Sequence, residues 1–184
     1  MVVRPFPDPS ILLHPQIPKP LHLMSPRDIL GPEWWDKTRK EAYGRYYPYC
    51  HACCVDKYEA KYHYWLEGHE MYDIDYTTGR VEFVEVVALC HSCHSFIHQG
   101  RLRMLTGIGK ISQEQYHSIL AHGRKVLAEA GLLSKVPKYV EEGTGHTAKW
   151  EDYHMVIHGV RYEQRFKSYE EWRSYWEKHN KEKQ

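Results

Sequence analysis

The stretch that decides the fold opens with Cys50-His-Ala-Cys53 and closes with Cys90-His-Ser-Cys93-His94-Ser-Phe-Ile-His98. Each Cys-x-x-Cys pair forms a turn that directs two thiolates to one point, and two such pairs supply the ligands of a tetrahedral zinc site. Redox-active pairs usually occur singly, which argues against a disulfide. We expect Cys54 to be a small buried thiol rather than a fifth ligand. The predicted ligands of a structural zinc ion are Cys50, Cys53, Cys90 and Cys93.

The residues between the two cysteine pairs predict a β-hairpin followed by a helix. An extended segment, 65–75, leads through a turn at Thr77-Thr78-Gly79-Arg80 into the apolar, β-branched run 81–89, a pattern typical of a hairpin. After it come His94 and His98, four residues apart. On a helix this spacing stacks both imidazoles on one face, so they can share a cation.

These residues resemble the HNH endonuclease superfamily, in its branch stapled by a zinc ribbon. The resemblance covers residues 50–100 and is carried by Leu66-Glu67-x-His69-Glu70-x-Tyr72 and by Leu89-Cys90-x-x-Cys93-His94-x-x-x-His98-x-Gly100. It implies an α+β fold with a ββα-metal core held by the four-cysteine zinc site. It also implies a metal-dependent endonuclease that hydrolyses DNA phosphodiester bonds. Small HNH proteins are frequent in phage genomes, which makes a phage origin an expectation too.

The family's functional residues carry over through the motif. His94 matches the final histidine, His98 matches an additional ligand of related branches, and His69 falls in the region of the first histidine. The resemblance therefore assigns a catalytic Mg²⁺, Mn²⁺ or other divalent ion to these three histidines, with Glu70 or His69 as the base that activates water. The chain departs from the family twice, with Glu70 in place of a histidine and Glu85 in place of an asparagine. A carboxylate with an ordinary pKa of about 4.3 is a weaker base than imidazole near neutral pH.

Three other histidines, His51, His63 and His91, are left out of the predicted metal set. A lone histidine in an aromatic segment, such as His63, usually packs against neighbours or faces solvent. His91 is the first to reconsider, because it lies inside the second Cys-x-x-Cys pair.

Charge is distributed unevenly along the chain. Residues 101–140 hold seven lysines and arginines against two glutamates, whereas residues 41–100 hold four against nine carboxylates. An acidic region that binds a cation, followed by a basic one that binds phosphate, suits a phosphodiesterase. The predicted phosphate contacts are Arg101, Arg103 and Lys110, with a solvated helix face as the alternative. The net charge of +1 favours weak or local contact with DNA, since proteins that bind duplex through its backbone are usually much more basic.

We expect three parts in the chain. Residues 1–30 are proline-rich and predict an extended arm, because proline lacks the backbone donor that helices and sheets use. Residues 31–140 form the HNH-like zinc-bound domain with flanking helices, one of which begins after Ser112 with a capping box. Residues 150–184 predict a β-hairpin and a helix, joined to the rest by a polar linker at 141–149.

Composition limits the class of protein. Hydrophobic residues make up 42% of the chain and charged residues 27%, which indicates a globular protein. The five cysteines do not suggest a secreted disulfide framework, and no segment has the pattern of a signal or membrane span. We therefore expect a cytoplasmic protein, in the host's cytoplasm if phage-encoded, with no membrane partner. The alternative function is a catalytically degenerate HNH-like zinc module that binds nucleic acid or a protein, the latter through the arm or the C-terminal hairpin and helix.

Overall fold

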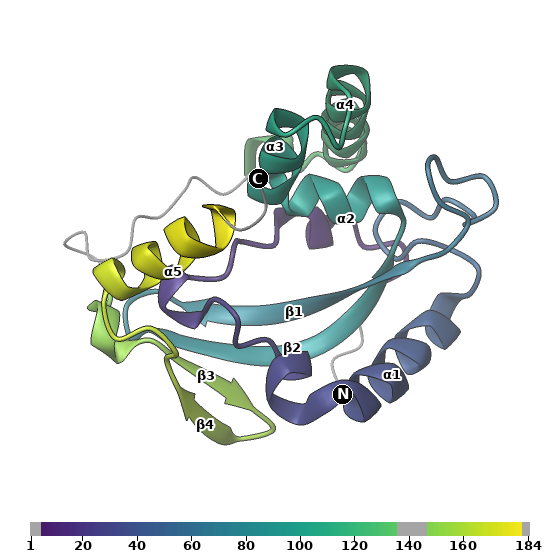
Figure 1. The fold of residues 1–184 in the computed structure, drawn as a ribbon. Coiled ribbons are helices and arrows are strands. Elements are labelled where there is room, and N and C mark those ends of the chain that lie inside the picture. The colour runs from purple at the N-terminus through teal and green to yellow at the C-terminus, as the bar shows by residue number, and fades with distance from the viewer. Residues whose placement is uncertain (1–4, 136–146, 182–184) are drawn as a thin grey trace. The chain divides into compact units, whose positions relative to one another are not determined.

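The computed structural model describes residues 5–135 and 147–181, so most of the predicted linker at 141–149 lies outside the described residues. The described chain has an α+β fold with five α-helices and a four-stranded sheet of order β1-β2-β3-β4 (Figure 1). It divides into two compact units. Their described parts are residues 5–16, 37–69 and 86–135 for the first unit, and 17–36, 70–85 and 147–181 for the second.

The predicted hairpin consists of β1 (Glu67–Asp75) and β2 (Arg80–Leu89), neighbours in the sheet. Its turn is held by Asp75, whose side chain accepts hydrogen bonds from Thr77 and Thr78. These bonds lower the pKa of Asp75 to about 2. The hairpin confirms the sequence-based prediction. Each of its strands runs through both units, so the hairpin supplies residues to each unit.

The sheet is extended by β3 (His154–Ile157) and β4 (Val160–Glu163), the second predicted hairpin. The two strands are antiparallel, and β3 lies parallel to β2, with Arg80 opposite His154. Their two-residue turn has positive φ at His158 and Gly159, as a type I′ turn requires. The C-terminal hairpin is therefore part of one sheet with β1 and β2.

Three helices of the first unit pack on one another (Figure 1). They are α2 (His91–Ile97), α3 (Gln99–Gly107) and α4 (Gln113–Glu129). The predicted cap of α4 is confirmed, because Ser112 Oγ accepts a hydrogen bond from the Gln115 amide at 3.1 Å. The sequence did not predict α3. The buried apolar side chains of this unit include Ile11, Leu89, Ile97, Leu102, Ile119 and Leu127.

From residue 5 on, the N-terminal segment is more structured than the extended arm expected from its prolines; residues 1–4 lie outside the described residues. It forms two 3₁₀ turns, η1 (Pro9–Leu13) and η2 (Lys19–Leu21), and then enters α1 (Pro26–Tyr46). Within the first unit, η1 packs against α2 and α4, and its Ile11 is fully buried. The helix α1 is kinked at Gly31, where φ is 86°, immediately before Pro32.

The last helix, α5 (Tyr169–Lys181), belongs to the second unit and packs against η2 there. Trp172 Nε1 donates a hydrogen bond to His22 Nδ1 at 3.0 Å, so the aromatic side of this helix contacts its own chain. Two short 3₁₀ turns, η3 (Leu133–Lys135) and η4 (Trp150–Asp152), complete the elements. Within residues 5–135 and 147–181, no helix combines the length and the hydropathy needed to cross a membrane.

A close approach between α4 and α2 generates the first prediction. A methyl group added at Gly123 would lie 2.2 Å from ring carbons of Phe96, which is itself buried. Alanine raises helix propensity by about 1 kcal/mol over glycine, but overpacking costs about 1–3 kcal/mol. We expect Gly123→Ala to lower the free energy of unfolding, measured by urea denaturation.

Gly44→Ala is the matched control. Gly44 is an exposed helical glycine of α1, and a methyl group there meets no heavy atom within 4 Å. This substitution should raise the free energy of unfolding by about 0.5–1 kcal/mol. Equal stabilisation by both substitutions would contradict the packing of α4 on α2.

Candidate metal centre

Four cysteine sulfurs converge in the first unit. Cys50 and Cys53 lie in the loop after α1, and Cys90 and Cys93 lie at the start of α2. The four Sγ atoms lie within 4.8 Å of one another, and those of Cys53 and Cys90 are 3.8 Å apart. Zinc–sulfur bonds of about 2.3 Å in a tetrahedron separate the sulfurs by about 3.8 Å. The cluster therefore has the dimensions needed to bind a metal such as zinc.

The protonation of this cluster also suits a cation. Burial disfavours a charged Cys50, yet hydrogen bonds from the thiols of Cys53, Cys90 and Cys93 lower its pKa well below the ordinary value. Hydrogen bonds to Cys50 and then to Cys53 raise the pKa of Cys90 and of Cys93. One thiolate is thus stabilised at the expense of its neighbours, and four can coexist only around a positive ion that displaces the remaining protons.

The backbone and a neighbouring side chain support the cluster. The amide of His51 donates to the carbonyl of Ala88 at 2.9 Å, which ties the first cysteine loop to β2. His122 of α4 places Nε2 at 3.3 Å from the sulfur of Cys93, where an N–H group can stabilise a thiolate. Cys54 is exposed rather than buried, which corrects the sequence-based expectation, and it is not one of the four clustered cysteines.

The predicted histidines meet in a second cluster of the same unit. His69 comes from β1, His94 from α2, and His98 caps the C-terminus of α2. One ring nitrogen of each lies within 4.8 Å of the others, and His69 Nδ1 is 3.2 Å from His98 Nε2. The structure therefore brings together the three residues to which the sequence assigns a divalent ion.

Electrostatics keep this histidine cluster ready to bind a cation. Burial, followed by the charges of His98 and His14, lowers the pKa of His69 well below its ordinary value. Burial, followed by the charges of His94 and Arg101, lowers the pKa of His98 to about 3. Both rings are therefore neutral near pH 7, and neutral imidazole is the form that binds a metal.

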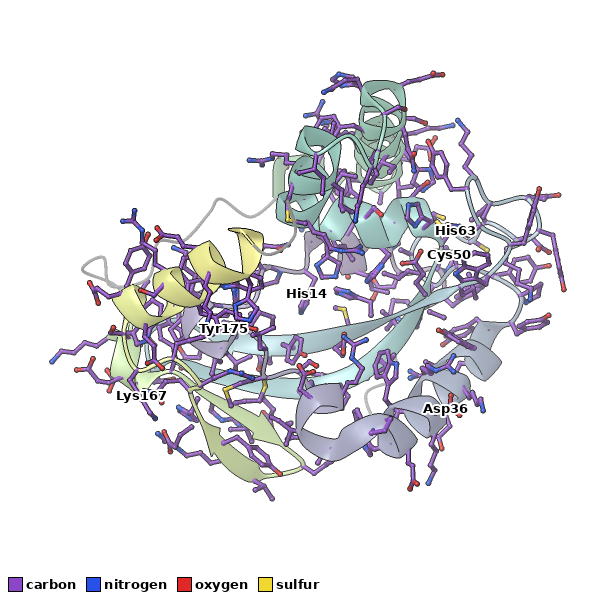
Figure 2. All side chains as sticks on the ribbon, viewed as in Figure 1. His14, Asp36, Cys50, His63, Lys167 and Tyr175 are labelled. Carbon is purple, nitrogen blue, oxygen red and sulfur yellow. The ribbon has the colours of Figure 1, made fainter. Side chains whose placement is uncertain are left out.

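Two residues outside the predicted set orient these ligands. Glu67 Oε2 accepts a hydrogen bond from His94 Nδ1 at 2.5 Å, which leaves the other nitrogen of that ring free for a metal. His14 Nδ1 lies 3.4 Å from His69 Nε2. Figure 2 labels His14, together with Cys50 and His63 of the same unit. Carboxylates and other polar groups commonly hold metal-binding histidines in this way.

A local signal points to Glu67, but none points to His14. Glu67 stands two residues before His69 on the same strand, and the two-residue period of a strand puts both side chains on one face. His14 is separated from His69 by 55 residues of sequence. Nothing near His14 in the chain indicates that it reaches β1.

Glu70 does not join the histidine cluster. It follows His69 on β1, and successive side chains of a strand point to opposite faces. The pKa of Tyr72 is raised well above its ordinary value, mainly by burial and then by the charge of Glu70. Glu85, in the place of the family's asparagine, is half-buried on β2. The predicted role of Glu70 as a base stays a prediction.

A pocket of about 250 Å³ lies beside the histidine cluster, within the first unit. Its lining includes His98, the basic side chains of Arg101 and Lys110, and two further histidines, His63 and His91. Arg103, the third predicted phosphate contact, is exposed on α3 but does not line this pocket. The pocket therefore places two of the three predicted cations next to one candidate ligand.

Comparisons of the chain with protein-family models, curated protein sequences and solved structures found no match.

The cysteine cluster generates the second prediction. Cys93→Ser removes a buried sulfur from the set of four, so we expect loss of the bound metal and a lower unfolding temperature, because a structural metal stabilises only the folded chain. Metal analysis of purified protein and thermal unfolding followed by circular dichroism provide the two measurements.

Cys54→Ser is its control, since this exposed cysteine is not one of the clustered four. Metal content and unfolding temperature should both match wild type. If Cys93→Ser also kept the metal, the four sulfurs would not form the site.

Proposed function

We propose that this chain is an HNH-type, divalent-metal-dependent endonuclease that hydrolyses DNA phosphodiester bonds. The observation that carries the proposal is the convergence of His69, His94 and His98 beside a pocket that also contains Arg101 and Lys110. The chain order of a hairpin, a cysteine cluster and a short histidine-bearing helix supports a ββα-metal core. In this proposal the four cysteines hold structural zinc, and the three histidines hold Mg²⁺, Mn²⁺ or another divalent ion.

The ion at the three histidines would act as a Lewis acid on the phosphate and would lower the pKa of its bound water. The chain's own contribution is to hold the ligands in place. Glu67 fixes the ring of His94, and His14 lies against the second nitrogen of His69. Such supporting contacts typically affect metal affinity or activity by about 10–100-fold.

The pocket provides contacts for the substrate around the reacting phosphate. Arg101 and Lys110 are exposed cations on its wall and can pair with neighbouring phosphates. Next to it, Trp65 is 56% exposed and stacks on His63 with ring centroids 4.2 Å apart. An exposed indole can stack on an unpaired base, which contributes about 1–3 kcal/mol.

Whether the site contains a catalytic base decides between this function and a second candidate. His69 has both ring nitrogens beside other imidazoles, which suits a ligand better than a base. Glu70 extends from the opposite face of β1. This placement favours, as the second candidate, a catalytically silent HNH-like module that binds nucleic acid without cutting it.

The third prediction separates the two candidates by plasmid nicking with Mg²⁺, Mn²⁺ or Ni²⁺. We expect wild type to nick and His98→Ala to lose activity, because one ligand of the ion is gone. Glu67→Gln should lower activity by about 10–100-fold, because the His94 ring is held less firmly. Glu70→Ala should abolish nicking only if Glu70 is the base.

His117→Ala controls for the general effect of removing a histidine, since His117 is exposed on α4 and is not a member of any clustered group among the described residues. Its nicking should equal that of wild type. A wild type that binds DNA but never nicks it would favour the silent module. Nicking unaffected by His98→Ala would exclude the histidine site.

The fourth prediction concerns the two arginines of α3. Arg101 lines the pocket and Arg103 does not. We expect Arg101→Gln to weaken DNA binding and to reduce the slope of log affinity against log salt by about 0.9, the value for one lost contact to duplex phosphate. Fluorescence anisotropy over a salt series measures both quantities.

Arg103→Gln is the matched control, because it removes the same charge from the same helix. Its salt dependence should stay close to that of wild type. Equal effects of the two substitutions would indicate a diffuse electrostatic contribution and would contradict a phosphate contact in the pocket.

A further inference from the structure

A third group of potential ligands has two of its three members, His63 and His91, on the wall of the pocket. It consists of His63, Glu67 and His91, and one ligand atom of each lies within 4.8 Å of the others. Glu67 Oε1 is 2.7 Å from His91 Nδ1 and 3.9 Å from His63 Nε2. The sequence-based prediction left out both histidines, His63 as a lone histidine in an aromatic segment and His91 as the first to reconsider, because it lies inside the second Cys-x-x-Cys pair.

The chemistry of this group is that of a metal site. Two imidazoles and one carboxylate form the ligand set of many zinc enzymes and of some iron enzymes. Each side chain keeps partial access to solvent, with exposed fractions of 30% for His63, 20% for Glu67 and 13% for His91. An ion can therefore enter and keep a coordination position open toward the pocket.

Neighbouring side chains already hold the two histidines in place. The ring of His63 stacks on Trp65 with an interplanar angle of 12°. The other nitrogen of His91, Nε2, lies 3.4 Å from the hydroxyl of Ser95, which turns Nδ1 toward Glu67. Metal-binding imidazoles usually have such a second contact, which selects the nitrogen that binds.

Glu67 links this group to the first histidine cluster. Its Oε2 contacts His94, and its Oε1 contacts His91. A carboxylate that touches a different imidazole with each oxygen can orient a ligand of one ion and bind the other ion directly. The group of His63, Glu67 and His91 therefore needs no atom that the cluster of His69, His94 and His98 uses as a ligand.

We propose that His63, Glu67 and His91 form a third metal site, in addition to the four cysteines and the three clustered histidines. It would bind a divalent cation of the zinc class at the same pocket. On binding, the ion replaces the proton between His91 Nδ1 and Glu67 Oε1, and that proton leaves to solvent. The use of this ion rests on the proposed function, in which its charge would add to that of Arg101 and Lys110 beside the phosphates of the substrate. The occupancy of the site does not depend on that function.

The test is metal stoichiometry of the full-length, tag-free chain. Each variant is equilibrated by dialysis against zinc, and the ions bound per chain are counted by metal analysis. Wild type should bind three equivalents, one for each of the three groups. His63→Ala and His98→Ala should each bind one equivalent fewer, and the double variant should lose both. His117→Ala, the exposed control, should match wild type.

A second variant guards against misfolding. His63→Phe removes the ligand nitrogen and keeps a ring to stack on Trp65, so it should lose the same equivalent with an unchanged circular dichroism spectrum. Retention of the full zinc content by His63→Phe would overturn the proposal. So would a double variant that loses no more than either single variant, because one shared site would then explain both. If wild type bound three equivalents of zinc but did not nick DNA, the proposed nuclease activity would be refuted and the proposed metal site would stand.

Discussion

The convergence of four sulfur atoms is the constraint on which the candidate site depends. It joins the loop at 50–53 to residues 90–93, which lie at the far end of the hairpin and begin α2. The next residue after the last cysteine is His94, so an ion bound by the four sulfurs would also set the start of the helix that carries His94 and ends at His98. A shift of one residue in that start would rotate the histidines by about 100° around the helix axis.

A single carboxylate organises the polar side of the same unit. Glu67 lies between His91 and His94. Burial opposes its ionisation, yet its hydrogen bonds with these two histidines lower its pKa far below the ordinary value. The carboxylate is therefore ionised whenever the protein is folded at neutral pH. A fixed negative charge between two imidazoles stabilises a nearby cation and selects the ring nitrogen that faces it. Glu67, a residue of the motif to which the resemblance assigns no role, thus contacts a member of each of the two histidine-containing groups.

Local patterns predicted much of this structure. The cysteine cluster, the two hairpins and the cap at Ser112 follow from spacing or from turn chemistry, and the meeting of His69 with His94 and His98 follows from the resemblance to the HNH superfamily. The parallel pairing of β3 with β2 does not, because it depends on contacts between segments far apart in the chain. The same holds for His14. His63 was left out as a lone histidine of an aromatic segment and His91 although it lies inside the second cysteine pair, and only the folded chain shows that Glu67 joins them. The helix α3 follows α2 after a single residue, too short a break for a separate start signal to be recognised.

Under the proposed function, a chain with a net charge of only +1 must attract a polyanion, and the neutrality of His69 and His98 bears on how it would do so. Three neutral imidazoles cancel none of the double charge of a bound ion, which leaves Glu67 as a single negative charge beside it, whereas four thiolates more than cancel the charge of the ion that they bind. Loading the histidines would therefore create a positive potential beside Arg101 and Lys110 that the amino-acid composition does not reveal. The supply of divalent ions would then govern attraction to nucleic acid as well as any chemistry performed on it.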